Sequence, residues 1–465
     1  MTRSQCVVVG GGPAGLAAAR TAARHGVRVV LVDENSELGG QHYRQMPAGF
    51  RAPERARIGR ESDEGRRLID EVRGLGVEVR LESVAWGIFD GRVVALATSG
   101  ESSRIAAETL ILAPGAYDRP VPFPGWTLPG VITASGAQNL VKAYRVLPGR
   151  RVLIAGSGPL LLAVAHSLLA GGARIAAICE ASPMRHLWRY GPRLLPHLNF
   201  VQQGHHYRRE IAEAGVPFLA GHVIRRALGG AEVTGAVVSP CDGEWRPVGG
   251  TELHYDADCV VVGYGFLSSL ELSRLAGCEE RYAAGLGDYV PVRSRELEST
   301  VPGIFVVGAG ARVPGAAVAL EEGHLAGLAV ANRLGLLTGR GYSREASRAR
   351  GRLLHLAGFR RVMDDLYRFG AGLHALADDL TTLCRCEEVA VSEAVAAVRD
   401  GARHVDEVKA WTRIGMGRCQ GRMCGPALAH VIARATGGPV TEAGVFTPRP
   451  PVKPVRLAAL ARGGD

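Results

Sequence analysis

Residues 6–34, "CVVVGGGPAGLAAARTAARHGVRVVLVDE", contain the strongest fold signal in the chain. A short apolar strand is followed by a glycine-rich turn, an alanine-rich helical segment and a second apolar strand that ends in two acids. The turn reads Gly10-Gly11-Gly12-Pro13-Ala14-Gly15. This order is typical of βαβ units that bind dinucleotides. The stretch therefore predicts an α/β protein with a Rossmann-like unit at its start.

Each glycine of this turn is required for a different physical reason. Gly10 allows the tight turn, Gly12 lets the backbone approach a pyrophosphate, and Gly15 lets the helix pack closely on the strand. The free N–H groups and the positive end of the helix dipole favour phosphates. Asp33 stands where a carboxylate can accept a hydrogen bond from a ribose hydroxyl, and Glu34 follows it.

Two later stretches are expected to contribute to the same nucleotide site. In "ELGGQHYRQ", Gly40 and Gln41 belong to a loop that can lie against the cofactor. In "TLILAPGAYDRP", a buried strand ends at Ala113, and Gly115 completes a turn that returns the chain to the nucleotide. The residues 42–44 follow near the expected cofactor, as possible contacts or as loop packing, and no substrate base is evident.

Residues 151–180 repeat the unit imperfectly. A strand leads to a turn with Gly156 and Gly158, a helix follows, and a second strand ends at Glu180. Leu161 replaces the third glycine, so the helix must sit farther from the strand or tilt. Glu180 favours a free ribose 2′-hydroxyl, and hence NAD over NADP. The alternative is a retained scaffold without a catalytic nucleotide.

Length and charge limit the function classes. The 465 residues predict two or three domains. The net charge is +10, and residues 340–370 hold eight arginines, which form either a solvated helical face or a docking surface for an acidic partner. No nucleic-acid motif accompanies them, so we expect no nucleic-acid partner.

The apolar stretch 152–173 has no Asp, Glu, Lys or Arg and is long enough to cross a membrane. Glycines and a proline interrupt it after a short strand, so we expect a strand, a turn and a helix, and no transmembrane segment. The N-terminus has no pattern of a secretory signal. Nine cysteines without such a signal predict a cytoplasmic protein whose clustered thiols bind metal or do redox chemistry.

Four of the cysteines form two close pairs near the end of the chain: Cys384, Cys386, Cys419 and Cys424. Residues i and i+2 do not share a helix face, so the first pair requires an extended or looped backbone. Glycines around the second pair leave N–H groups free to bond to sulfur. Four thiolates suit a [2Fe–2S] cluster or zinc, and a vestigial or disulfide site is the third possibility.

Residues 301–334 resemble the segment that returns to the FAD domain in thioredoxin-reductase-like flavoproteins. That family has Gly-Asp where this chain has Gly308-Ala309, which removes one polar anchor for the ribityl chain. The paired cysteines of the disulfide reductases are absent near the expected flavin. The C-terminal spacing of cysteines resembles the bacterioferritin-associated-ferredoxin-like (BFD-like) module.

The whole chain resembles the α subunits of bacterial heteromeric amino-acid and opine dehydrogenases, such as opine oxidase, D-hydroxyproline dehydrogenase and hydrogen cyanide synthase. The stretches "VDE…GGQ", "GYGF", "LCRCEEV" and "RPPVKPVRLAALA" carry this resemblance. It implies an electron-transfer subunit with FAD and a [2Fe–2S] cluster, and a partner flavoprotein β subunit that oxidises the C–N bond of an amino acid, imino acid or opine. It also allows a small ferredoxin-like subunit, NAD or another nucleotide at the second unit, and an FMN shared with a partner.

The resemblance implies an α/β fold with two Rossmann-like domains and a small helical four-cysteine domain. The expected parts are an FAD-binding domain (1–120 and 290–335), an NAD-like domain (121–289), a helical linker (336–380), an iron–sulfur domain (381–440) and a tail (441–465). Residues 186–210 form either a subunit contact or a solvated amphipathic segment. Two other functions stay open: a self-sufficient NAD(P)H oxidoreductase, and a structural subunit with degenerate nucleotide sites.

Overall fold

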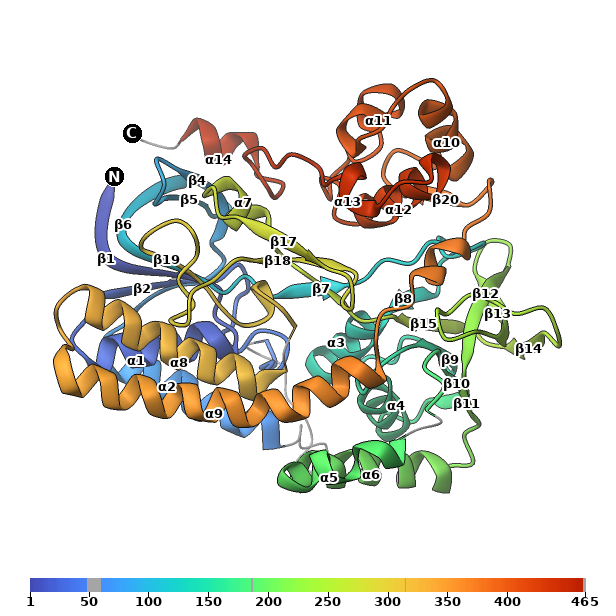
Figure 1. Cartoon of the computed structure of the whole chain (residues 1–465), viewed down its shortest axis with the longest axis horizontal. Helices are drawn as coiled ribbons and strands as arrows, with labels where there is room; N and C mark the ends of the chain where they lie inside the picture. Colours follow the sequence, from blue (N-terminus) through green and yellow to red (C-terminus); the bar gives the residue numbers. More distant parts are fainter. Residues whose placement is uncertain (48–59, 185–186, 314, 463–465) are drawn as a thin grey trace.

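The structure is a computed structural model that describes residues 1–47, 60–184, 187–313 and 315–462. Figure 1 shows two α/β units and, above the second, a small helical module formed by the C-terminal region. The first sheet has the order β3-β2-β1-β6-β5-β4, and β19 also pairs with β6. Its parallel strands are β1 (Thr2–Val9), β2 (Val29–Val32), β3 (Glu78–Arg80), β6 (Ser102–Leu112) and β19 (Ile304–Val306). The antiparallel strands β4 (Val84–Phe89) and β5 (Val93–Ala97) extend it.

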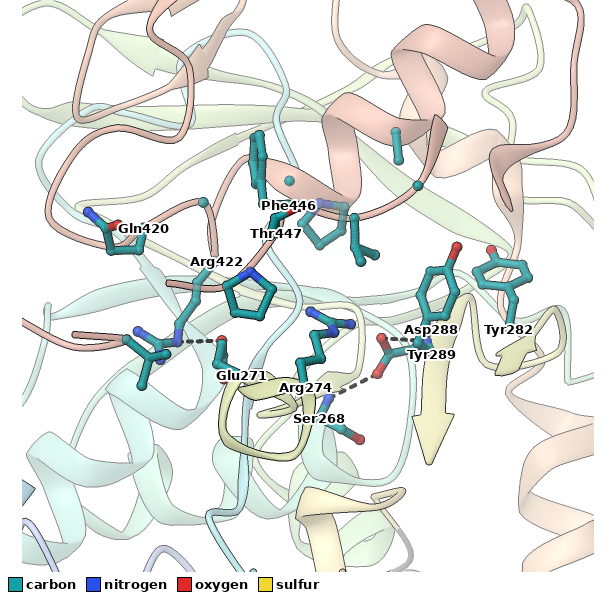
Figure 2. A pocket seen from close by; sticks show the side chains of 18 of the residues that line it. Ser268, Glu271, Arg274, Tyr282, Asp288, Tyr289, Gln420, Arg422, Phe446 and Thr447 are labelled. Carbon is teal, nitrogen blue, oxygen red and sulfur yellow. Dashed lines mark hydrogen bonds and ion pairs between the residues drawn. The ribbon is translucent and has the colours of Figure 1, made fainter. Parts of the chain in front are cut away.

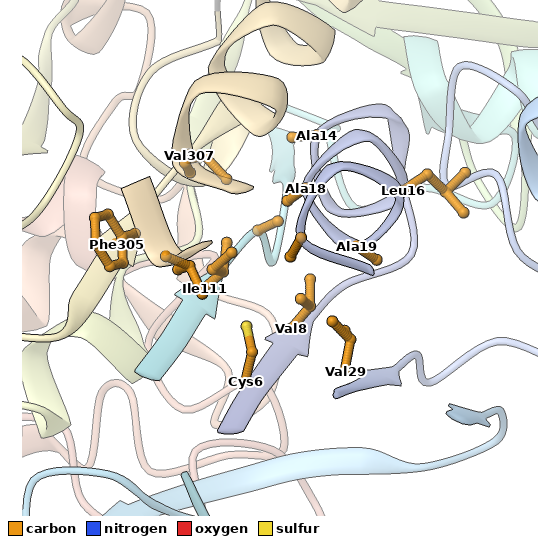
Figure 3. Close-up of a cluster of buried hydrophobic side chains, with 14 of the residues drawn as sticks. Cys6, Val8, Ala14, Leu16, Ala18, Ala19, Val29, Ile111, Phe305 and Val307 are labelled. Carbon is orange, nitrogen blue, oxygen red and sulfur yellow. The ribbon is translucent and has the colours of Figure 1, made fainter. Parts of the chain in front are cut away.

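Helices α1 (Pro13–Arg24) and α8 (Ala316–Arg333) pack closely beside this sheet. A Cβ on Gly323 would lie 2.0 Å from the Ala14 carbonyl oxygen, so the two helices leave no room for a side chain there. Figure 3 shows the core that α1 buries: small residues such as Ala18 and Ala19 face Val8 and Ile111 of the strands. The alanine-rich sequence of α1 thus allows this close approach.

The second unit has a five-stranded parallel sheet of order β11-β10-β9-β15-β8. Its strands are β8 (Val131–Thr133), β9 (Arg151–Gly156), β10 (Arg174–Glu180), β11 (Phe218–Ala220) and β15 (Cys259–Gly263). Helices α3 (Ala134–Tyr144), α4 (Leu160–Ala170) and α6 (Leu198–Glu213) cover it. The expected strand, turn and helix over 152–173 are confirmed by β9 and α4. Among the described helices, none combines the length and the apolarity that a membrane crossing requires.

Within the expected linker (336–380), the chain forms a long helix, α9 (Gly339–Leu366). Several of its arginines pair with carboxylates of the first unit, for example Arg350 with Glu296 at 3.0 Å. The segment 195–200 packs against α9, because the rings of Phe200 and Phe359 stack at 4.6 Å. Part of the segment 186–210 therefore packs against the chain itself through His197 and Phe200, while Leu195 and Leu198 are exposed.

The C-terminal module has its own hydrophobic core, formed by residues between Ala377 and Ala443. Its elements are β20 (Thr382–Cys384), β21 (Val389–Ala390), α10 (Val391–Arg399), α11 (Val405–Thr412), α12 (Gly425–Thr436) and α13 (Val440–Ala443). The tail then returns to the first sheet, where the Val452 N–H donates to the Trp86 carbonyl at 2.9 Å. The short helix α14 (Leu457–Ala461) ends the described chain beside β6.

Candidate functional site

The first dinucleotide unit brings its glycine turn against the end of β6. Gly10 has a φ of +105°, and a Cβ on it would lie 2.1 Å from the Ala113 carbonyl oxygen. A Cβ on Gly15 would lie 1.8 Å from the Gly10 carbonyl oxygen. Both positions therefore exclude every residue except glycine, for the reasons of turn geometry and helix–strand packing that the sequence suggested. Gly115, with a φ of +81°, turns the chain away from β6.

Gly12 is different, because its missing side chain leaves open space. The nearest protein atom to a Cβ there is the Gly40 Cα at 3.8 Å. Gly40 itself has a φ of +60° and lies against Gly12, so the loop that carries Gly40 and the exposed Gln41 adjoins the turn. Together with the N-terminus of α1 at Pro13, this forms a backbone cradle that fits a dinucleotide pyrophosphate.

The two acids after β2 have internal partners. Asp33 is 7% exposed, and its carboxylate accepts hydrogen bonds from the Gly11 N–H at 2.6 Å and from Asn35 at 2.8 Å. Glu34 forms an ion pair with Lys453 of the tail. Asp33 thus holds the glycine turn in place and Glu34 holds the tail, while their contact with a ribose stays a prediction.

Gly308 follows β19 and completes this site. Its φ is +63°, and a Cβ on it would lie 2.7 Å from the Ala14 Cβ. The Gly308 N–H donates to Glu322 at 2.7 Å, and Glu322 also pairs with Arg293 at 3.2 Å. The carboxyl ends of β1, β6 and β19 therefore converge, which is where ligands bind in open α/β sheets.

The second unit has a similar turn with a different packing. A Cβ on Gly156 would lie 2.1 Å from the Gly263 carbonyl oxygen, and Gly158 has a φ of +114°. Gly263, on the neighbouring strand β15, also explains how Leu161 fits, because a Cβ at Gly263 would lie 2.7 Å from the Ala134 Cβ and 3.1 Å from the Leu161 side chain. Glu180 is 2% exposed and accepts from the Gly158 N–H at 2.9 Å. Burial raises the pKa of the Glu180 carboxyl.

The four C-terminal cysteines lie in one module, where Cys384 and Cys424 shift the pKa of each other and Cys386 contributes to the raised pKa of Cys419. The pKa of Cys384 is lowered to about 5, because the Cys424 thiol and backbone N–H groups, including that of Gly415, donate to its sulfur. All nine thiols of the chain are free. Within the described residues, no three His, Cys, Asp or Glu side chains stand together as a ready metal site. The donor set fits an iron–sulfur cluster or zinc by its chemistry.

A cavity that is partly open to solvent lies between the module, the tail and the two α/β units. Figure 2 shows its lining, in which Arg422 pairs with Glu271 at 2.7 Å. Four cations line it: Arg274, Lys409, Arg422 and Arg449. Four aromatic rings also line it: Tyr117, Tyr282, Tyr289 and Phe446. The carboxylates of Glu271 and Asp288 line it as well, and Arg274 pairs with Glu280, so the cavity offers groups of both charges beside its aromatic rings.

Sequence reasoning missed several residues around this cavity. His374 and His430 stack with their ring centroids 3.9 Å apart, and burial lowers the pKa of both. Phe446 and Lys453 lie in a tail with no periodic pattern. Only tertiary contacts bring these residues to the sites. The one signal for them in the sequence was the glycine-rich loop, whose missing side chains leave room for Phe446.

Comparison with known proteins agrees with this architecture. A family described as pyridine nucleotide-disulphide oxidoreductase matches residues 4–323, and one described as sarcosine oxidase A3 domain matches residues 382–464. An opine oxidase subunit of Rhizobium meliloti (strain 1021) is 34% identical, with 99% of both chains covered. The hydrogen cyanide synthase subunit HcnB of Pseudomonas aeruginosa is 34% identical, with 98% of both chains covered.

A solved structure has the same fold over nearly the whole chain. L-proline dehydrogenase from P. horikoshii superposes with a TM-score of 0.70 at 20% identity, over 99% of this chain and 80% of that one. The full-length resemblance to heteromeric dehydrogenase subunits is confirmed by the opine oxidase and hydrogen cyanide synthase relatives. The chain therefore belongs to the pyridine nucleotide-disulphide oxidoreductase family, together with these opine oxidase and hydrogen cyanide synthase subunits.

Proposed function

We propose that this chain is the electron-transfer subunit, with FAD and a [2Fe–2S] cluster, of a heteromeric oxidoreductase. Its complex would oxidise the C–N bond of an amino acid, imino acid or opine, on a partner flavoprotein subunit. The observation that carries the proposal is the presence of four free cysteines in one C-terminal module and an intact dinucleotide cradle in the same chain. The full-length relatives, which are subunits of an opine oxidase and of a hydrogen cyanide synthase, support the multi-subunit setting.

The FAD would be held by the backbone of the first turn and by the segments that meet it. Gly10, Gly12 and the N-terminus of α1 would bind the pyrophosphate through N–H groups. Gly40 and Gly308 bring their loops within contact of that turn. The flavin supplies two-electron oxidation and one-electron release when bound. Nucleotide binding at Gly156, Gly158 and Glu180 stays a prediction, because Glu180 is already engaged by backbone N–H groups.

The cluster would be held by Cys384, Cys386, Cys419 and Cys424. Cys384 and Cys424 are buried, so the module itself excludes water from one pair. The backbone N–H groups aimed at Cys384 favour its thiolate form, which is the form that binds iron. The cluster supplies one-electron transfer when bound, and the four residues determine its position.

The cavity supports a second flavin shared with the partner. Its arginines and lysine suit a phosphate, and its tyrosines suit an apolar ring. Because part of it is open, a β subunit can close it and contribute the substrate-binding surface. We propose FMN as its ligand. We also propose that a further partner is a small ferredoxin-like subunit, and that the compartment is the cytosol, where nine free thiols stay reduced.

Anaerobic purification followed by flavin, iron and zinc analysis tests the cofactor part. The wild-type chain should contain FAD, two irons and two sulfides, and the double variant Cys384→Ser/Cys386→Ser should lose the iron and keep the FAD. Cys241→Ser, outside the module, is the matched control and should keep both. Zinc without iron, or a colourless wild-type protein, would refute the cofactor assignment.

Coexpression with a neighbouring β-type flavoprotein tests the partner. The complex should oxidise an amino acid, imino acid or opine, and the isolated chain should not. NADH should bleach the flavin of the isolated chain slowly or not at all. Rapid bleaching by NADH without a partner would instead identify a self-sufficient NADH oxidoreductase.

A further inference from the structure

The ring of Phe446 lies against the cysteine loop of the module. A Cβ on Gly421 would lie 2.2 Å from this ring, a Cβ on Gly415 2.7 Å, and a Cβ on Gly425 3.0 Å. Gly421 stands between Cys419 and Cys424, and Gly425 follows directly after Cys424. One aromatic ring therefore fills the space that three glycines of this loop leave free.

The same ring lines the cavity on its other side. Phe446, Gln420 and Arg422 all line that cavity, and Figure 2 shows Phe446 above the ribbon that carries Gln420 and Arg422. The Lys409 ammonium lies 5.4 Å from the ring centroid. The ring therefore covers part of the loop that carries Cys419 and Cys424, on the side where Gly421 and Gly425 also line the cavity.

The tail is anchored on both sides of this ring. Before the ring, Ala443 is 2% exposed in the core of the module, and after it the tail makes two further contacts. The Thr447 hydroxyl donates to Asp406 at 2.7 Å, and its N–H donates to the same carboxylate at 3.2 Å. Farther along, Val452 is 3% exposed and pairs with Trp86 of the first sheet. Because the backbone is fixed at both ends, the position of the ring is set by the fold.

We propose that Phe446 is a positioning residue that forms part of a dry wall over the cysteine loop, on the side of the cavity, and so helps to set the redox potential of the centre held there. This inference rests on the proposed cluster. Solvent exposure helps to set the potential of iron–sulfur centres. Water stabilises the more highly charged reduced state, so a ring that excludes water keeps the potential low.

A graded series at position 446 tests the wall. The potential is measured by a redox titration followed by electron paramagnetic resonance. In Phe446→Ala it should rise by at least about 59 mV, which is a tenfold change in the reduced-to-oxidised ratio for one electron. Phe446→Val should lie between the alanine variant and wild type, and Phe446→Leu, which keeps apolar cover, should stay close to wild type. An unchanged potential in all three variants would overturn the proposal.

Thr447→Val is the matched control, because it removes one side-chain contact next to the ring and keeps both the ring and the backbone N–H contact with Asp406. It removes the hydroxyl contact with Asp406 and should leave the potential unchanged. If Thr447→Val shifted the potential as much as Phe446→Ala, the effect would come from tail detachment and the wall would be refuted.

Hydrogen exchange gives a second readout that needs no cluster. Amides of residues 419–425 should exchange at least tenfold faster in Phe446→Val than in wild type, with or without iron. A wild-type protein without iron would end the cluster assignment, while this exchange result would still decide whether the ring shields the loop. Equal exchange in both proteins would overturn the wall even if the cluster is present.

Discussion

Gly10 and Gly12 belong to one turn but have separate physical requirements. Gly10 needs a φ of +105° and touches the Ala113 carbonyl, whereas Gly12 has extended geometry and faces open space. An alanine substitution at Gly10 therefore tests what the fold requires, and one at Gly12 tests what the ligand requires.

We predict that Gly10→Ala lowers the free energy of unfolding by about 3 kcal/mol or more, because the backbone must move to admit the Cβ. Gly12→Ala should change it by less than about 0.5 kcal/mol, yet should lose most of the bound flavin because the Cβ fills the pyrophosphate cradle. Denaturant unfolding and flavin content measure the two effects. Retention of flavin by a well-folded Gly12→Ala protein would contradict a ligand at this turn.

His430 is predicted to make stability pH-dependent. Burial lowers its pKa to about 4, and the unfolded chain has the ordinary value near about 6.5. The unfolded state therefore binds more protons between these two values, so the free energy of unfolding falls as the pH falls from about 6.5 to about 4. Across this pH range the free energy of unfolding of the wild type should fall by about 1–3 kcal/mol more than that of His430→Phe, as measured by denaturant titrations. Parallel pH curves for the two proteins would contradict the burial of a neutral ring.

At the scale of elements, α1 and α8 approach through small residues. Gly323→Ala places a Cβ 2.0 Å from the Ala14 carbonyl and should lower the unfolding free energy by about 2–3 kcal/mol. Gly351→Ala is the control: it lies exposed in α9 with open space around it, and should raise the unfolding free energy by up to about 1 kcal/mol through helix propensity. Thermal unfolding distinguishes them, and equal effects of the two substitutions would contradict the close helix contact.

At the scale of the whole molecule, the module docks through a few polar contacts. The Trp126 indole N–H donates to the Thr382 carbonyl at 2.7 Å, and Arg422 pairs with Glu271 where both side chains are less than 20% exposed. A charge left without its partner at such a site destabilises the docked state.

Glu271→Gln should therefore weaken docking of the module by about 1–2 kcal/mol, after allowance for partial solvent access. Glu213→Gln, in the exposed pair Arg209–Glu213, is the control and should have an effect below about 0.5 kcal/mol. Proteolysis of the segment around residue 380, compared between the two variants, measures the docking. Equal cleavage rates would show that the Glu271 pair does not hold the module.

The local signals of the sequence predicted the elements that carry the candidate sites. The turn from Gly10 to Gly15 and the strand that ends at Ala113 were readable because their chemistry is contained in a few consecutive residues. The pairing of Cys384 with Cys424 was not readable, because spacing alone leaves the partners of four thiols open. The contact by which Gly263 leaves room for Leu161 could not be predicted either, because Gly263 lies on a different strand.

By itself, the sequence determined the α/β class, the two βαβ turns and the four-cysteine module, because each depends on local backbone geometry and residue spacing. Only the tertiary structure decided that the tail returns past the module, that Phe446 covers the glycines of the cysteine loop, and that Lys453 meets Glu34. The physical reason is that such contacts join segments far apart in the chain, and the packing of whole domains selects them from many partners of similar local chemistry.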